Sequence, residues 1–209
     1  SWVSDVRKPA NMVFQIDTSG SMEGERLDAL KAALVSLTDT GADGTTSLLT
    51  FQPREMVHFV EFGSEIKSFL HHPHFQKELN EKALESYLSF QDPSDVRAYV
   101  EGLRTAGNTA IYGTLQHSLE LAAQSRSDDN VTSVVLFSDG ENTDYPGIAE
   151  FSSWYEATPE VQGIPVYAIL FGEASRAEME QLTQLTGGRA FDATGGDLTA
   201  AFKEIRGYL

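Results

Sequence analysis

Apolar runs of strand length alternate with amphipathic stretches of helix length along most of the chain, and this alternation restricts the fold to few architectures. The run at residues 11–16 stops at an aspartate, a glycine-containing turn follows, and an amphipathic helix is predicted over residues 25–37. The run at residues 131–137 is apolar on both faces, which is typical of the middle of a parallel sheet. The pattern predicts an α/β fold: a doubly wound (Rossmann-like), mostly parallel six-stranded sheet with helices on both faces.

The remaining segments complete this prediction. Two β-rich runs, at residues 45–51 and 57–62, are separated by a short segment, so we expect a hairpin whose second strand is the one antiparallel edge strand. From residue 63 to about residue 105 the pattern is helical but irregular, with helices predicted near residues 75–90 and 94–103. The later elements are predicted in the order helix 109–124, strand 131–137, helix 148–157, strand 165–171, helix 176–186, strand 189–192 and helix 198–208.

The composition is that of a globular protein, and its charge limits the possible partners. The chain has 209 residues, no cysteine, and 31 acidic residues against 15 lysines and arginines, for a formal net charge of -16. The lack of cysteine excludes disulfides, zinc-thiolate sites and thiol catalysis, and leaves the redox compartment undecided. Because a negative field repels phosphate backbones and anionic lipids, no nucleic-acid partner is expected. No window approaches the ~20 apolar residues of a spanning helix, so we expect no membrane insertion by this domain.

We expect residues 1–209 to form a single domain, with a helical elaboration at about residues 63–105. No signal peptide is recognisable at the first residues, and the chain opens almost directly on a predicted strand. The domain is therefore expected to be a piece of a longer protein.

Oxygen-bearing side chains stand at three equivalent places in this pattern. Asp17, Ser19 and Ser21 come directly after the first strand, Thr109 opens a helix, and Asp139 follows the fourth strand. Because loops beyond the carboxyl ends of parallel strands meet where the strand order reverses, these residues are expected to be neighbours in space. Alternate residues of an extended segment point the same way, so the three side chains of the first loop can converge. A turn with a serine helix cap would explain any one serine, but not all three places together.

The side-chain types at these places indicate a hard cation. Two carboxylates and three hydroxyls offer only oxygen, which Mg²⁺ prefers, with Ca²⁺ and Mn²⁺ as other candidates, whereas softer metals would bring His or Cys. Glu141 and Asp144 could form a second cation site, although a solvated acidic loop is the favoured interpretation. His71, His72 and His74 are a weaker candidate for a transition metal, because two of them are adjacent on a predicted loop.

Together the three motifs resemble those of von Willebrand factor A (vWA) domains. The sequence DTSGS at residues 17–21 looks like the metal ion-dependent adhesion site (MIDAS) motif of that family, GNTAIY at residues 107–112 like its threonine loop, and SDGE at residues 138–141 like its third motif. Their order and approximate distances agree with the family. The sequence RKPA at residues 7–10 is most like bacterial members, some of which are fused to other extracytoplasmic modules.

The resemblance implies a binding function. It implies that Ser19 and Ser21 coordinate the metal directly, that Asp17, Thr109 and Asp139 do so directly or through water, and that one position is left for an Asp or Glu of a partner protein. Family members commonly act in adhesion or assembly, so no enzymatic activity is expected. Some relatives move their last helix when ligand binds, here residues 198–208. The expected location is extracellular, periplasmic or at the cell surface, with a cytoplasmic one left open.

A magnesium-dependent phosphate-cleaving enzyme of doubly wound fold is the alternative function. Such an enzyme also places an aspartate after its first strand, but it normally has a second acidic residue two places on, where this chain has Ser19. Neither a Gly-x-Ser-x-Gly nucleophile elbow nor a phosphate-binding Gly-x-x-x-x-Gly-Lys loop occurs in the sequence. Loss of partner binding on chelation, without turnover, would distinguish the binding module from the enzyme.

Overall fold

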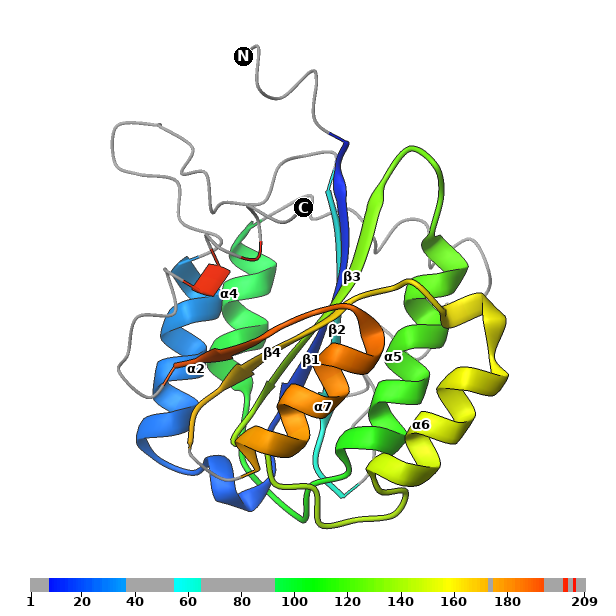
Figure 1. The fold of residues 1–209 in the computed structure, drawn as a ribbon. Helices are drawn as coiled ribbons and strands as arrows, with labels where there is room; N and C mark the ends of the chain where they lie inside the picture. Colours follow the sequence, from blue (N-terminus) through cyan, green and yellow to red (C-terminus); the bar gives the residue numbers. More distant parts are fainter. Residues whose placement is uncertain are drawn as a thin grey trace, which may run out of the picture.

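The sheet has five parallel strands in the part of the chain that the structure describes. The computed structural model of the protein describes residues 8–36, 55–64, 93–172, 175–193, 201–202 and 205 (Figure 1). The strands are β1 (Ala10–Asp17), β2 (Met56–Phe62), β3 (Val131–Ser138), β4 (Val166–Leu170) and β5 (Ala190–Asp192). They lie in the order β2-β1-β3-β4-β5, and every neighbouring pair is parallel. The predicted α/β architecture with a parallel sheet is confirmed.

Helices cover both faces of this sheet (Figure 1). One face carries α2 (Glu25–Ser36) and α4 (Pro93–Gly102), and the other carries α5 (Ile111–Ser125), α6 (Ile148–Ala157) and α7 (Arg176–Thr186). Two short 3₁₀ helices, η1 (Gly20–Met22) and η3 (Pro159–Val161), complete the described elements. None of the helices in the described ranges has the length and apolar character that crossing a bilayer requires.

Strand β1 is buried along its whole length because its side chains enter two separate cores. Phe14 lies in the core on the α2 side, where its ring packs edge-on against Phe59 and Phe137 with centroids 5.7 and 5.3 Å apart. Val13 and Leu136 lie in the other core, on the α5 side. Burial of one such side chain stabilises the fold by roughly 1.5–3 kcal/mol. The two cores therefore hold β1 and β3 firmly, and with them the loops at their carboxyl ends.

The prediction of an antiparallel edge strand at residues 57–62 is wrong. Strand β2 pairs with β1 in parallel, with Asn11 opposite Met56 and Asp17 opposite Phe62. The prediction took the direction of this strand from its link to residues 45–51, whereas its described neighbour in the sheet is β1. Residues 57–62 are instead buried throughout, as expected for a strand that joins a parallel sheet covered on both faces.

Several predicted elements lie outside the described residues. They include the strand at residues 45–51 and the helix at residues 75–90, so the architecture of much of the elaboration at residues 63–105 is not described. The helix predicted at residues 94–103 corresponds to α4. Of the last predicted helix, residues 201, 202 and 205 are described as helical, and Phe202 and Ile205 are buried in the core on the α2 side.

Candidate metal centre

The strand order reverses at β1, and the carboxyl ends of β1 and β3 form the candidate site. From β1 the chain goes to β2 on one side, whereas β3, β4 and β5 lie on the other. Asp17 is the last residue of β1, and Asp139 directly follows the last residue of β3. Because a doubly wound sheet opens a crevice at such a point, both residues lie where this fold places ligands.

Asp17, Ser19 and Ser21 converge in the turn after β1. Ser19 donates its backbone N–H to Asp17 Oδ1 at 2.9 Å, and the hydroxyl oxygens of Ser19 and Ser21 lie 3.1 Å apart. Asp17 and Ser19 are fully buried. Met22, at the end of the turn, is buried in the core on the α2 side and anchors the loop. Three side chains that carry oxygen are thereby gathered within one turn.

Asp139 lies beside this turn, and Ser138 connects the two. The Ser138 hydroxyl donates a hydrogen bond to Asp17 Oδ2, and Asp139 Oδ2 accepts one from Arg26 Nη1 at 2.9 Å. Burial raises the pKa of the Asp17 carboxyl above its usual value; the charge of Asp139 adds to the rise, and the hydrogen bonds from Ser138 and Ser19 oppose it. The charged form of Asp17 is therefore disfavoured mainly because the carboxyl is removed from water.

The loop of Thr109 is tied to the first loop through its backbone. Gly20 donates its N–H to the carbonyl of Gly107 at 2.9 Å. Gly107 has a φ of +82°, a backbone conformation that favours glycine, and a Cβ there would lie only 2.5 Å from Ser64 Oγ. Both the backbone conformation and the nearby Ser64 side chain therefore favour glycine at this position. Thr109 is buried, but within the described ranges no hydrogen bond joins its hydroxyl to the other four candidate ligands.

A second network, which the sequence did not reveal, fastens the loop of Asp139 to the loop of Thr109. The N–H of Thr109 donates to Thr143 Oγ1 at 2.9 Å, and the N–H of Thr143 donates to the Thr109 carbonyl at 2.9 Å. Asn142 Oδ1 accepts the N–H of Ile111 at 2.9 Å, and the amide group of Asn142 donates to two carbonyls further along its own loop. The polar residues after Asp139 are a weak sequence signal for such a loop, because nothing local identifies their partners.

The other predicted metal positions differ from the main site. Asp144 accepts a hydrogen bond from Asn108 Nδ2 at 3.3 Å, whereas Glu141 is exposed. Among the described residues, no group of three or more His, Cys, Asp or Glu side chains is placed to hold a metal. The histidines at residues 71, 72 and 74 lie outside the described residues.

The donor set fits a hard divalent cation. Asp17, Ser19, Ser21 and Asp139 present carboxylate and hydroxyl oxygens, the ligand type that Mg²⁺ and Mn²⁺ take in proteins. The two carboxylates are buried, and Asp139 shares its charge with the guanidinium of Arg26. Additional positive charge at this place would offset the cost of burying the Asp17 carboxylate.

Comparison with protein-family models identifies the family of the chain. The model of the von Willebrand factor type A domain matches residues 11–204 of the chain. The chain belongs to the von Willebrand factor type A family. Domains of this family typically act as protein-binding modules without catalytic activity, and they often bind a divalent cation. The matched residues of this vWA domain include all three loops of the candidate site.

The vWA domain is also similar in sequence to part of a much longer animal protein. The inter-alpha-trypsin inhibitor heavy chain H4 of Bos taurus is 22% identical over 140 residues, which cover 65% of this chain and 13% of that protein. The chain therefore spans only a small part of the length of this relative.

Solved structures with low sequence identity share the fold. A von Willebrand factor type A protein from Catenulispora acidiphila matches with a TM-score of 0.67 and 17% identity, over 95% of this chain and 42% of that chain. The PilB minor pilin of Streptococcus sanguinis matches with a TM-score of 0.63 and 15% identity, over 97% and 61%. Manganese-loaded TRAP protein of Plasmodium vivax matches with a TM-score of 0.54 and 15% identity, over 94% and 71%.

Proposed function

We propose that this vWA domain holds one divalent cation, in the first place Mg²⁺, at Asp17, Ser19, Ser21, Thr109 and Asp139, and uses it to bind an acidic side chain of a partner protein. The observation that carries the proposal is the meeting of two buried carboxylates and the serine hydroxyls where the strand order reverses. When bound, the cation supplies a positive charge with a coordination position open to a carboxylate.

The five side chains divide into neutral and charged donors. Ser19, Ser21 and Thr109 contribute hydroxyls, which leave most of the charge of a cation uncancelled and therefore available to an acidic partner. Asp17 and Asp139 supply the negative charge that retains the cation before a partner arrives. Hydrogen bonds to Asp17 from the Ser19 N–H and the Ser138 hydroxyl hold that carboxylate in one orientation. Donors oriented in advance lower the ordering cost of binding.

The role that we propose is adhesion or assembly outside the cytoplasm. It is supported by the likeness in fold to a minor pilin and to a protein known in a manganese-loaded form. Catalysis is not part of the proposal, because a serine stands two places after Asp17, where a phosphate-cleaving enzyme normally has its second acid.

Mg²⁺ titration of a matched pair of serine variants tests the proposal. Ser19→Ala removes a proposed ligand, whereas Ser153→Ala removes a hydroxyl that donates to the Ala149 carbonyl within α6, away from the site. Isothermal titration calorimetry should detect Mg²⁺ binding to the wild type and to Ser153→Ala with equal affinity. Ser19→Ala should bind Mg²⁺ at least about tenfold more weakly, since even residues that only support metal ligands contribute that much.

The outcomes separate the candidate functions. Equal Mg²⁺ affinity in Ser19→Ala and the wild type would contradict the site, and the lack of any Mg²⁺ binding by the wild type would contradict the proposal as a whole. Hydrolysis of p-nitrophenyl phosphate that requires Mg²⁺ and disappears in Ser19→Ala would instead establish the phosphate-cleaving alternative.

A further inference from the structure

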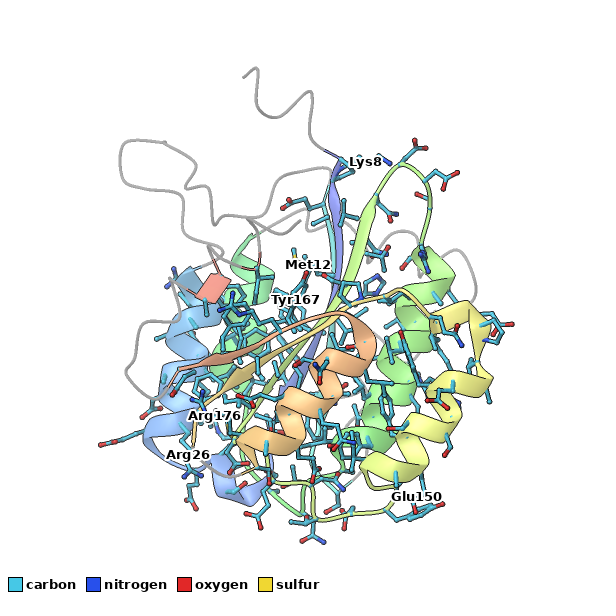
Figure 2. The ribbon with its side chains drawn as sticks, in the orientation of Figure 1. Lys8, Met12, Arg26, Glu150, Tyr167 and Arg176 are labelled. Carbon is cyan, nitrogen blue, oxygen red and sulfur yellow. The ribbon has the colours of Figure 1, made fainter. Side chains whose placement is uncertain are left out.

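Arg26 reaches from the first turn of α2 into the candidate metal centre. Its Nη1 donates to the carbonyl of Ser21 at 2.9 Å and to Asp139 Oδ2 at 2.9 Å. Its Nη2 lies 3.5 Å from the place where a Cβ of Gly172 would be, so the guanidinium also lies against the loop after β4. Figure 2 shows Arg26 at the N-terminal end of α2, on the side of the sheet where the strands end. One side chain thus contacts the loops that follow β1, β3 and β4.

The ion pair between Arg26 and Asp139 is asymmetric. The side chain of Asp139 is 3% exposed, whereas that of Arg26 is 44% exposed. The acid is therefore largely removed from water, whereas the base lies at the solvent-exposed rim of the site. A buried carboxylate that loses its partner is strongly destabilised, so Asp139 needs a cation in every state of the domain.

We infer that Arg26 is a built-in counter-cation for Asp139, which stabilises the site in the metal-free domain and weakens divalent-cation binding by competing for the same carboxylate. This inference rests on the proposed function, since the competition requires a metal at this site. The physical basis is that two positive charges drawn to one carboxylate repel each other at short range. The guanidinium thus keeps the loops in place without metal and makes metal binding readily reversible.

If Arg26 helped metal binding instead of opposing it, its removal would change the Mg²⁺ affinity in the opposite direction. If Arg26 served only to orient Asp139 as a ligand, its removal would leave that carboxylate misplaced and metal binding would weaken. If Arg26 competes with the metal, its removal strengthens metal binding and weakens the metal-free fold. The sign of the change in affinity therefore decides between the two roles.

Mg²⁺ titrations of Arg26→Gln and Lys31→Gln measure that sign. Both residues lie on α2, and each substitution removes one positive charge, so both change the formal net charge from -16 to -17. Lys31 Nζ donates to the carbonyl of Glu101 at 3.3 Å and not to the site. Isothermal titration calorimetry at physiological salt should show about tenfold tighter Mg²⁺ binding in Arg26→Gln, the order expected for removing one nearby charge. Lys31→Gln should bind Mg²⁺ like the wild type.

Thermal unfolding in EDTA provides a readout without metal. In EDTA, Arg26→Gln should unfold at a lower temperature than Lys31→Gln, because Asp139 is left unpaired. Saturating Mg²⁺ should reduce the difference in unfolding temperature between the two variants. Arg26→Lys keeps the charge, so it should bind Mg²⁺ with nearly the wild-type affinity.

Unchanged or weaker Mg²⁺ binding in Arg26→Gln would overturn the inference, and so would tighter binding in Arg26→Lys, because charge would then not be the cause. Tighter Mg²⁺ binding in Arg26→Lys would overturn the inference even if Arg26→Gln does not fold. If the wild type binds no Mg²⁺ at all, the proposed function itself fails, which is a different result from wild-type binding that Arg26 does not affect.

Discussion

Buried polar side chains lie at both ends of the β1–β3 pair, but the two ends differ in charge. At the amino ends, Asn11 Nδ2 donates to Ser125 Oγ at 2.9 Å and to Thr132 Oγ1 at 3.1 Å, and the Thr132 hydroxyl donates to Asn130 Oδ1 at 2.8 Å. Asn130 in turn donates to the Ser125 carbonyl at 2.9 Å. Every side chain in this cluster is neutral, and the donors and acceptors satisfy one another.

The carboxyl ends of the same strands carry two buried carboxyl groups, Asp17 and Asp139. Asp17 is fully buried near the negative charge of Asp139, and Arg26 approaches only from the rim. A satisfied neutral network stabilises a fold and needs nothing further. A buried charge with a perturbed pKa is instead typical of a functional site. In this sheet, charge and not burial alone therefore distinguishes the polar residues of a candidate functional site from those that only stabilise the fold.

The largest expected effect is the loss of stabilisation by Mg²⁺ when Asp17, at the carboxyl end of β1, is replaced. Mg²⁺ at about 100 times its dissociation constant should raise the free energy of unfolding of the wild type by ~2.7 kcal/mol, and Asp17→Ala should lose this gain. Urea unfolding with Mg²⁺ and with EDTA measures it. The variant should still fold in EDTA, because the substitution removes two hydrogen bonds but also a desolvated charge. Stabilisation by Mg²⁺ that persists in Asp17→Ala would refute the assignment of this end as the metal site.

The next largest expected effect is a pH-dependent change in stability caused by His58, which belongs to neither of the two polar clusters. His58 is buried in β2, and burial lowers its pKa to about 4. Because an unfolded histidine takes up its proton near pH 6.5, the unfolded state binds more protons between pH 6.5 and pH 4. The stability that neutral His58 contributes is complete above pH 6.5 and is lost as the pH falls toward 4, by about 2 kcal/mol at pH 5.

His58→Leu tests this dependence, since leucine does not titrate. Urea unfolding of the variant and the wild type at pH 7 and pH 5 should show that the wild type loses about 2 kcal/mol more than the variant. Parallel losses in the two proteins would mean that folding does not lower the pKa of His58. Mg²⁺ affinity at pH 7 should be equal in both, which separates this group from the carboxyl end.

The smallest expected effect is a loss of stability when the hydrogen-bonded cluster at the amino end of β1 is disrupted. Asn11→Ala removes a donor to Ser125 and Thr132, and should lower the free energy of unfolding by about 1–2 kcal/mol. Chemical denaturation in EDTA measures this loss. Mg²⁺ affinity should not change, because the cluster lies at the opposite end of β1. A change in affinity comparable to that of Ser19→Ala would mean that the two ends are coupled, and the comparison would then fail.

Local periodicity was sufficient to predict most of the described elements. The apolar runs that became β1 and β3 and the amphipathic stretches that became α2 and α7 agree with the structure within a few residues. This succeeds because a continuous short apolar run, or one apolar helical face, is a property of neighbours in the chain. The direction of β2 was predicted wrongly, because strand pairing depends on the neighbour in space.

The features of the candidate site also differ in how far the sequence alone could predict them. The convergence of Asp17, Ser19 and Ser21 follows from their spacing, since all three stand in one turn. The approach of Asp139 could be predicted only from the rule that strand ends meet at a reversal of strand order. The contact of Arg26 with Asp139 had no local signal, since the two residues are 113 positions apart.

By itself, the sequence determined the alternation of strands and helices, the all-oxygen character of the candidate ligands and the excess of negative charge, because these depend on residue type and on near neighbours. Only the tertiary structure decided that β2 runs parallel to β1, that Thr143 and Asn142 fasten the loop of Thr109, and that a guanidinium at the rim neutralises Asp139. Those contacts join residues far apart in the chain, and their geometry is set by how the two cores fix the ends of β1 and β3.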